Sequence, residues 1–207
     1  FTAASTKNTY SLAVEIASGY IEADTQIEKL YFPMTKDEAE VEAAWFDNAR
    51  QIKVQLEKGK TVVFLTLGDP TTYSTFGYIL KKMAVVMPDA AIETIPGITS
   101  FHAAAARLNR ILVEGEQSLL ITSGAFGGEL LRRSAGVDNA AIVKAYKNIK
   151  DINQALEQTG LARNSVAVSH CSREKEEIIP DIKRLEQRAP DYWTLILASR
   201  KGGKDRL

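Results

Sequence analysis

The sequence has little of what many functional classes need: one cysteine, two histidines, and no net charge, because 26 basic residues balance 26 acidic ones. The single thiol, Cys171, excludes an internal disulfide and cannot alone form a thiolate metal site, so we predict no metal and a reducing compartment. A neutral chain has no overall field to recruit nucleic acid or anionic membrane. No apolar run approaches the roughly 18 residues that cross a bilayer. We therefore expect a cytoplasmic protein with neither partner.

What is present is an ordinary globular composition, with 45% apolar and 25% charged residues in 207. Helical spacing predicts helices over 12–21, 36–58, 74–86 and 99–108, and apolar, β-branched runs predict strands over 61–67 and 91–95. The alternation continues with strands over 118–122, 140–146, 165–170 and 192–199, and with helices over 126–134, 149–158 and 180–188. This order predicts an α/β fold with largely parallel sheets. The loop-like residues 109–117 suggest two domains, residues 1–112 and 113–207.

Polar and glycine-rich residues follow the predicted strands. In an open α/β sheet, ligands bind outside the carboxyl ends of the strands. Four such ends stand out, at 68–70, 96–100, 122–124 and 170–172. Glycine lets the backbone approach a ligand closely, Asp69 can accept from an amine or hydroxyl, and Thr99 or Ser100 can cap the next helix. Any one of these loops is also compatible with a plain turn, but four together favour a shared ligand site.

Few side chains suggest acid–base or nucleophilic catalysis. Ser74 is equally well explained as a helix cap, His102 as a hydrogen-bonded helix residue, and Cys171 as a packed small residue. No nucleophile–base pair or Gly-x-Ser-x-Gly elbow occurs, so hydrolysis is not expected. Arg107 and Arg110 could clamp carboxylates, although exposed arginines usually cover a solvated face.

Two stretches, LGDPTTYSTF (67–76) and ETIPGITSFHAAAARLN (93–109), resemble the tetrapyrrole methylase family. Tyr-Ser-Thr after Gly-Asp-Pro, and Ser-Phe after Pro-Gly-Ile-Thr, are most similar to the precorrin-2 C20-methyltransferase branch. SLLITSG, VKAYKN, SHCSREKEEI and YWTLILASR also follow the family's order, so the resemblance covers nearly the whole chain.

The resemblance implies two α/β domains, the first with a mostly parallel sheet and the second with a mixed sheet, and S-adenosylmethionine in the cleft between them. It also implies a homodimer. By position, the cofactor-binding residues are Leu67, Gly68, Asp69, Thr72, Thr99, Ser100, Val143, Lys144 and Cys171. Two features depart from the family: Val143 replaces a usual methionine, and the family's first strand with its Gly-x-Gly-x-Gly-Asp-Pro loop has no counterpart, as if it preceded Phe1.

The function that the resemblance implies is methyl transfer from S-adenosylmethionine to C20 of precorrin-2, or of its cobalt form, in cobalamin synthesis. The sulfonium methyl is already activated, so the protein's task is mainly proximity and orientation, and no strong base is required. Tyr73 is the expected positioning residue, and Arg107 and Arg110 are candidates for the substrate carboxylates. The alternatives are methylation at another tetrapyrrole position and a non-catalytic nucleotide- or tetrapyrrole-binding module.

Overall fold

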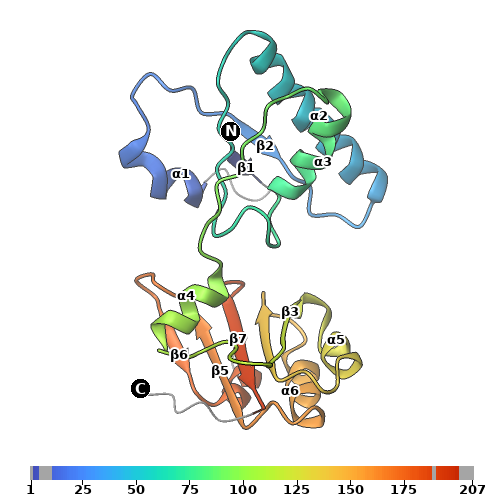
Figure 1. Cartoon of the computed structure of the whole chain (residues 1–207), viewed down its shortest axis with the longest axis vertical. Helices are drawn as coiled ribbons and strands as arrows, with labels where there is room; N and C mark the ends of the chain where they lie inside the picture. The colour runs from blue at the N-terminus through green and yellow to red at the C-terminus, as the bar shows by residue number, and fades with distance from the viewer. Residues whose placement is uncertain (1, 5–10, 188–189, 201–207) are drawn as a thin grey trace. The chain divides into compact units, whose positions relative to one another are not determined.

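The computed structural model describes residues 2–4, 11–187 and 190–200, which fall into two compact units, Phe1–Ile98 and Thr99–Leu207 (Figure 1). The division lies before helix α4 (Ser100–Arg107) rather than near residue 112 as the sequence suggested. The physical reason is the apolar face of α4, because Phe101 and Ala104 pack into one cluster with Ala141 and Leu197 of the second unit. The helix after the Pro-Gly turn therefore belongs to the second unit.

The first unit has one small sheet and two packed helices. Its elements are β1 (Thr2–Ala4), α1 (Leu12–Ala17), η1 (Ser18–Tyr20), β2 (Lys29–Tyr31), α2 (Glu38–Glu57) and α3 (Phe76–Val86). Strands β1 and β2 pair in parallel, with Thr2 opposite Lys29. The core is formed by Leu30 and Phe32 with residues from one face of each long helix: Ala49, Ile52, Ile79 and Met83.

Helix α2 illustrates how local sequence fixes this packing. The Asp37 carboxylate accepts from the backbone N–H groups of Ala39 (3.0 Å) and Glu40 (3.2 Å), which caps the helix start. Three turns on, the buried Asn48 donates to the carbonyl of Tyr31 at 2.7 Å and so ties the helix to the end of β2. A buried amide without this partner would be costly.

Two predicted strands of the first unit, 61–67 and 91–95, are not assigned as strands, apart from an isolated bridge residue at Leu65. Their side chains are partly or fully exposed, which differs from the two-sided burial that the apolar run indicated. The difference has a physical reason, because a β-branched run becomes a strand only when a neighbouring strand takes up its backbone hydrogen bonds.

The second unit is built on a five-stranded mixed sheet with the order β3-β4-β7-β5-β6. Its elements after α4 are β3 (Leu119–Ser123), η2 (Gly124–Phe126), α5 (Glu129–Arg133), β4 (Asn139–Val143), α6 (Ile149–Gln158), β5 (Asn164–Ser169), β6 (Glu177–Ile179), η3 (Ile182–Glu186) and β7 (Thr194–Ser199). Strands β3 and β4 are parallel, whereas β7 runs antiparallel to both β4 and β5. The expected mixed sheet is confirmed, while the short β6 was not predicted.

Both faces of this sheet are covered, so β4 and β7 are buried along their whole length. Successive residues alternate between the faces, as strand geometry requires. Ala140 and Ile142 pack with α5, α6 and η3, whereas Ala141 and Val143 pack with α4. No helix among the described residues is long and apolar enough to cross a membrane.

Neighbouring leucines on α5 provide a direct test of this packing. Leu131 is 1% exposed and lies in the larger core cluster, whereas Leu130 is 43% exposed. We expect Leu131→Ala to lower the free energy of unfolding by about 2–5 kcal/mol, because it opens a cavity. Leu130→Ala should stay within about 0.5 kcal/mol of the wild type. Chemical denaturation measures both, and equal losses would contradict the assignment of the inner face.

Candidate functional site

In the first unit, the candidate site centres on the loop 67–73. Gly68 has a φ of 68°, a left-handed conformation that glycine adopts without steric cost. The Asp69 carboxylate accepts from the backbone N–H of Thr71 at 2.9 Å, from the Thr71 hydroxyl and from the Thr72 hydroxyl at 3.3 Å. Its second oxygen accepts from the backbone N–H of Gly97 at 3.0 Å.

These contacts change the electrostatics of Asp69. Hydrogen bonds from the Thr71 hydroxyl, the Gly97 N–H and the Thr71 N–H lower its pKa to about 2. Because the folded-state pKa is depressed, the stabilisation is complete above the ordinary carboxyl pKa and is lost as the pH falls towards 2. Asp69 is therefore a carboxylate at any physiological pH.

Position 97, in the second loop of this unit, requires a glycine for steric reasons. A β-carbon at this position would overlap the carbonyl oxygen of Gly68. The two loops thus meet backbone to backbone. Both glycines are exposed, and we refer to their contact as the backbone cradle.

Tyr73 follows in a strained conformation, with a φ of 51° and half of its surface exposed. A bulky residue at positive φ is an outlier that the surrounding structure must hold in place. Next to it, the Ser74 hydroxyl accepts from the backbone N–H of Phe76 at 3.2 Å and bonds Thr66 at 2.9 Å. The Ser74 hydroxyl thus accepts from the first N–H of α3, although Thr75 occupies the N-cap position and caps with no side-chain bond.

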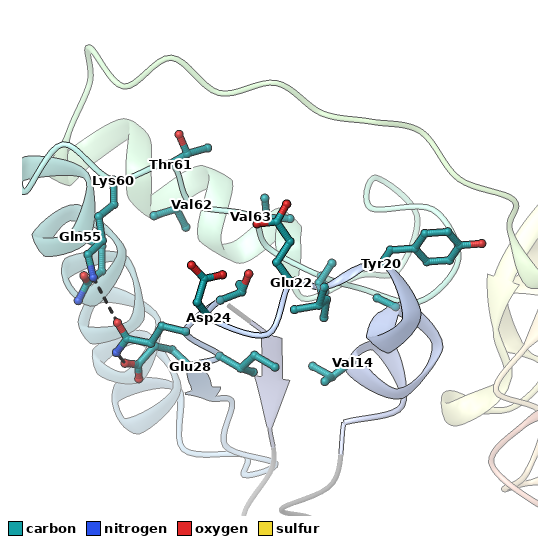
Figure 2. Close-up of a pocket in the computed structure, with 16 residues that line it drawn as sticks. Val14, Tyr20, Glu22, Asp24, Glu28, Gln55, Lys60, Thr61, Val62 and Val63 are labelled. Atoms are coloured by element: carbon teal, nitrogen blue, oxygen red, sulfur yellow. Dashed lines mark hydrogen bonds between the residues drawn. The ribbon is translucent and has the colours of Figure 1, made fainter.

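An open pocket of about 790 Å³ also lies in the first unit (Figure 2). Val62 and Val63 line it from segment 61–67, and Glu22, Asp24 and Glu28 line it from the loop before β2. Across the lining, the Lys60 ammonium donates to the Gln26 side chain at 3.2 Å. None of the site residues predicted from the sequence lines this pocket, so it is a separate feature of the unit.

In the second unit, the candidate residues gather at one edge of the sheet. Strands β4 and β5 both run antiparallel to β7, so their carboxyl ends lie at the same edge, where β7 begins. The N–H of Ala145 donates to the Thr194 carbonyl at 2.8 Å, and the N–H of His170 donates to the Trp193 carbonyl at 3.2 Å. These bonds tie the loops after Val143 and Ser169 to a common anchor.

Backbone strain concentrates in the same loops. Lys144, His170 and Ser172 have φ values of 56°, 50° and 61°. With Tyr73 in the first unit, they are four of the six non-glycine residues at positive φ in the part of the chain that the structure describes. Strained backbone is typical of ligand-binding loops, where the fold fixes a geometry that the chain would not adopt alone.

The loop around Cys171 is held by two acidic residues. Glu176 accepts from the Ser172 N–H and from Arg107 Nε, both at 2.7 Å, and its pKa is lowered mainly by the Ser172 bond. Asp191 lies 3.2 Å from His170 Nε2, and its pKa is lowered mainly by the N–H of Trp193. Sequence reasoning missed both carboxylates, and for Glu176 the reason is that a charged run such as REKEE looks like a solvated surface.

The candidate residues Thr99 and Ser100 lie at the N-terminus of helix α4. Thr99 Oγ1 accepts from the backbone N–H of His102 at 3.3 Å and lies 2.7 Å from His102 Nδ1. Thr99 is therefore the cap, with Ser100 as the first helical residue, and His102 is hydrogen-bonded within the helix as expected. Arg110 differs from its expected role, because it is buried and donates to the Asn164 carbonyl at 2.5 Å.

Cations and aromatic rings line the same edge of the second sheet. Lys147 Nζ lies 5.1 Å from the Tyr146 ring centroid, and Arg173 Cζ lies 5.2 Å from that of Trp193. Tyr192 packs edge-on against both Tyr146 and Trp193. We refer to Tyr146, Lys147, Arg173, Tyr192 and Trp193 as the cation–aromatic cluster. Sequence reasoning did not single it out, because its members come from three separate segments.

No group of three or more histidine, cysteine, aspartate or glutamate side chains in the described residues could hold a metal ion. What the geometry does provide is backbone-lined, strained loops at the ends of extended segments. These features define an α/β protein whose loops at the ends of extended segments form a candidate ligand site.

The chain belongs to the tetrapyrrole (corrin/porphyrin) methylases, whose family model matches residues 4–186. The resemblance inferred from the two Gly-containing stretches is thereby confirmed. The chain is 31% identical over 193 residues to a cobalt-precorrin-2 C(20)-methyltransferase of Salmonella typhimurium, covering 92% of this chain and 80% of that protein. It is 37% identical over 151 residues to a "probable cobalt-precorrin-2 C(20)-methyltransferase" of Methanocaldococcus jannaschii, covering 73% and 62%.

Solved structures agree with the fold. A uroporphyrin-III C-methyltransferase from Thermus thermophilus, complexed with S-adenosyl homocysteine, superposes with a TM-score of 0.55 at 19% identity. The match covers 83% of this chain and 76% of that chain. The α/β fold with a mixed sheet is thus shared with a tetrapyrrole methyltransferase.

The thiol of Cys171 offers a test of the second unit's loop. Burial raises the pKa of this thiol, so its thiolate fraction is reduced at neutral pH. We expect alkylation by iodoacetamide at pH 7 to be several-fold slower in the native protein than in urea. Because Cys171 is the chain's one cysteine, mass spectrometry follows its reaction directly. Equal rates in the two states would mean that this loop does not shield the thiol.

Proposed function

We propose that the protein is an S-adenosylmethionine-dependent C-methyltransferase that methylates C20 of precorrin-2, or of its cobalt form, in the synthesis of the corrin ring of cobalamin. Membership of the methylase family and the names of the two relatives support this assignment. The observation that carries it is the meeting of Gly68 and Gly97 beside the strained Tyr73, since this backbone cradle matches what the resemblance expects of a cofactor site.

The residues fit the cofactor in each unit considered by itself. In the first unit, only glycine satisfies the close approach at Gly97, and Gly68 and the neighbouring Leu67 present exposed backbone. In the second unit, the loops after Val143 and Ser169 are fixed by the start of β7. The residues proposed to form the cofactor site, by direct contact or by holding its loops, are Leu67, Gly68, Asp69 and Thr72 from the first unit, and Thr99, Ser100, Val143, Lys144 and Cys171 from the second.

When bound, S-adenosylmethionine supplies an already activated methyl group. The protein's own groups then have to orient the acceptor carbon and exclude water, and effective molarity can supply roughly 7–11 kcal/mol of the barrier. No general base is needed for this step, which agrees with histidines that are already engaged, His102 with Thr99 and His170 with Asp191. We assign positioning, not proton abstraction, to the exposed Tyr73 ring.

Two alternatives remain distinct from this proposal: methylation at another tetrapyrrole position, and a non-catalytic binding module. Incubating the purified protein with S-adenosylmethionine and either metal-free or cobalt-loaded precorrin-2 separates an enzyme from a binding module, and NMR of the product identifies the methylated carbon. An enzyme forms S-adenosylhomocysteine in step with a product heavier by one methyl group, and the preferred substrate forms it faster. Binding without S-adenosylhomocysteine would identify a binding module and overturn the proposal.

For the substrate carboxylates, the cation–aromatic cluster is a better candidate than the two arginines first considered. Arg107 is engaged with Glu176, and Arg110 is buried. Lys147 and Arg173 are exposed beside aromatic rings, a combination that suits a flat, carboxylate-bearing macrocycle. We further propose a homodimer in the cytoplasm, as the family resemblance implies, and light scattering at micromolar concentration tests the dimer.

Replacing Arg173 with alanine tests the cluster. We expect a several-fold higher KM for the tetrapyrrole, with the affinity for S-adenosylhomocysteine unchanged, because Arg173 lies in the cluster proposed for the substrate and is not among the proposed cofactor-site residues. Arg163→Ala is the matched control, since this exposed arginine precedes β5 and so lies at the opposite end of that strand. A loss of S-adenosylhomocysteine affinity in Arg173→Ala would assign the cluster to the cofactor instead.

Tyr73 variants test the positioning role. Tyr73→Phe should lower kcat about 10-fold, which corresponds to about 1.4 kcal/mol, because the phenol no longer fixes the substrate. Tyr73→Ala should lose more, because the ring is removed as well. Cofactor affinity should barely change in either variant. A wild-type rate in Tyr73→Ala would reduce Tyr73 to a packing residue.

A further inference from the structure

The Asp69 carboxylate connects two loops that are distant in the sequence. One oxygen accepts from the Thr71 N–H, the Thr71 hydroxyl and the Thr72 hydroxyl, all within its own loop. The other accepts from the Gly97 N–H, 28 residues further along the chain. Each oxygen therefore serves a different loop.

The backbone contact between the loops lies at the same place. The carbonyl of Gly68 occupies the space that a side chain at position 97 would need. Gly68 itself has a positive φ, so the direction of its carbonyl depends on a turn that few residues adopt. Without the hydrogen bond from Gly97 to Asp69, this close approach would depend on packing contacts alone.

We propose that Asp69 is a positioning residue that holds the 67–69 loop against Gly97, rather than a ligand for the amino group of the cofactor. A carboxylate offers about four lone-pair sites, two on each oxygen. Thr71 and Thr72 fully engage one oxygen, and the other accepts from the Gly97 N–H, so a ligand amine could reach only the oxygen that holds Gly97 and would compete with that bond. Asp69 acts through the backbone of Leu67 and Gly68, whose direction it sets.

The consequence for binding rests on the proposed function, because it concerns the cofactor. The clamp itself does not, since it joins groups within the first unit. This difference allows two readouts: the amide exchange rate of Gly97, measured by NMR, reports the clamp, and calorimetry with S-adenosylhomocysteine reports the site.

Asp69→Asn is the decisive variant, because an amide in this position can still accept from Thr71 but presents an NH₂ group to Gly97. We expect faster exchange of the Gly97 amide and an affinity for S-adenosylhomocysteine lowered about 10-fold, a typical effect of losing a hydrogen bond to a charged group. Asp89→Asn, an exposed aspartate of the same unit, should change neither quantity.

A double-mutant cycle with Gly97→Ala adds a test of mechanism. Because both substitutions break the same contact, their effects on S-adenosylhomocysteine affinity should be less than additive. Lost affinity with an unchanged Gly97 exchange rate, or fully additive effects, would overturn the clamp and make Asp69 a direct cofactor ligand.

A pH titration of the wild-type protein tests the same bond without any substitution. The amide shift of Gly97 should titrate with the Asp69 carboxyl as the pH falls towards 2, and an amide shift that stays constant would contradict the bond. A wild-type protein that binds no S-adenosylhomocysteine would refute the proposed function, while the Gly97 amide would still decide the clamp.

Discussion

The close approach of Gly68 and Gly97 is the constraint on which the candidate site of the first unit depends. It requires the absence of a side chain at position 97 and a left-handed turn at position 68, and it carries a hydrogen bond across the contact. Asp69 supplies the acceptor and remains ionised because hydrogen bonds depress its pKa. The Gly-Asp-Pro sequence is thus explained by backbone geometry: glycine gives the turn, and aspartate fastens it to the second loop.

In the second unit, the candidate loops also adopt left-handed backbone, but at residues other than glycine. Lys144, His170 and Ser172 adopt left-handed conformations, and carboxylates hold the loop around Cys171, with Glu176 on one side and Asp191 on the other. A mixed sheet makes this possible, because the antiparallel β7 begins where β4 and β5 end and offers its first carbonyls as anchors. Both units therefore present rigid backbone, which suits a reaction that depends on orientation more than on acid–base chemistry.

The secondary structure could be predicted from the sequence where local patterns are sufficient. Helix α6 begins and ends where its periodicity indicated, because its apolar face alone determines its packing. The strand predicted over 61–67 was wrong, because a strand forms only with a partner strand, and the residues of the segment do not specify that partner. The structure divides the chain before α4, because this helix packs on a sheet formed downstream, whereas the sequence suggested a boundary near residue 112.

Some residues of the candidate site could likewise be predicted from local sequence, and others could not. Gly68, Asp69 and Thr99 were singled out from residue type and position, and Thr99 does cap its helix. The partner of Asp69, the burial of Arg110 and the cation–aromatic cluster depend on contacts between distant segments. Periodicity and motif spacing carry no information about such contacts. Glu176 shows the limit most clearly, because a single carboxylate in a charged run proves to hold the Cys171 loop.

We propose that the protein places a tetrapyrrole carbon in line with the methyl group of S-adenosylmethionine. S-adenosylmethionine carrying a ¹³C-labelled methyl group, with precorrin-2 as the acceptor, tests this directly when carbon NMR of the product is recorded. We expect one labelled methyl group bonded to C20. Label at any other carbon would show that the macrocycle is held in a different orientation, and no transfer at all would contradict the assignment as a methyltransferase.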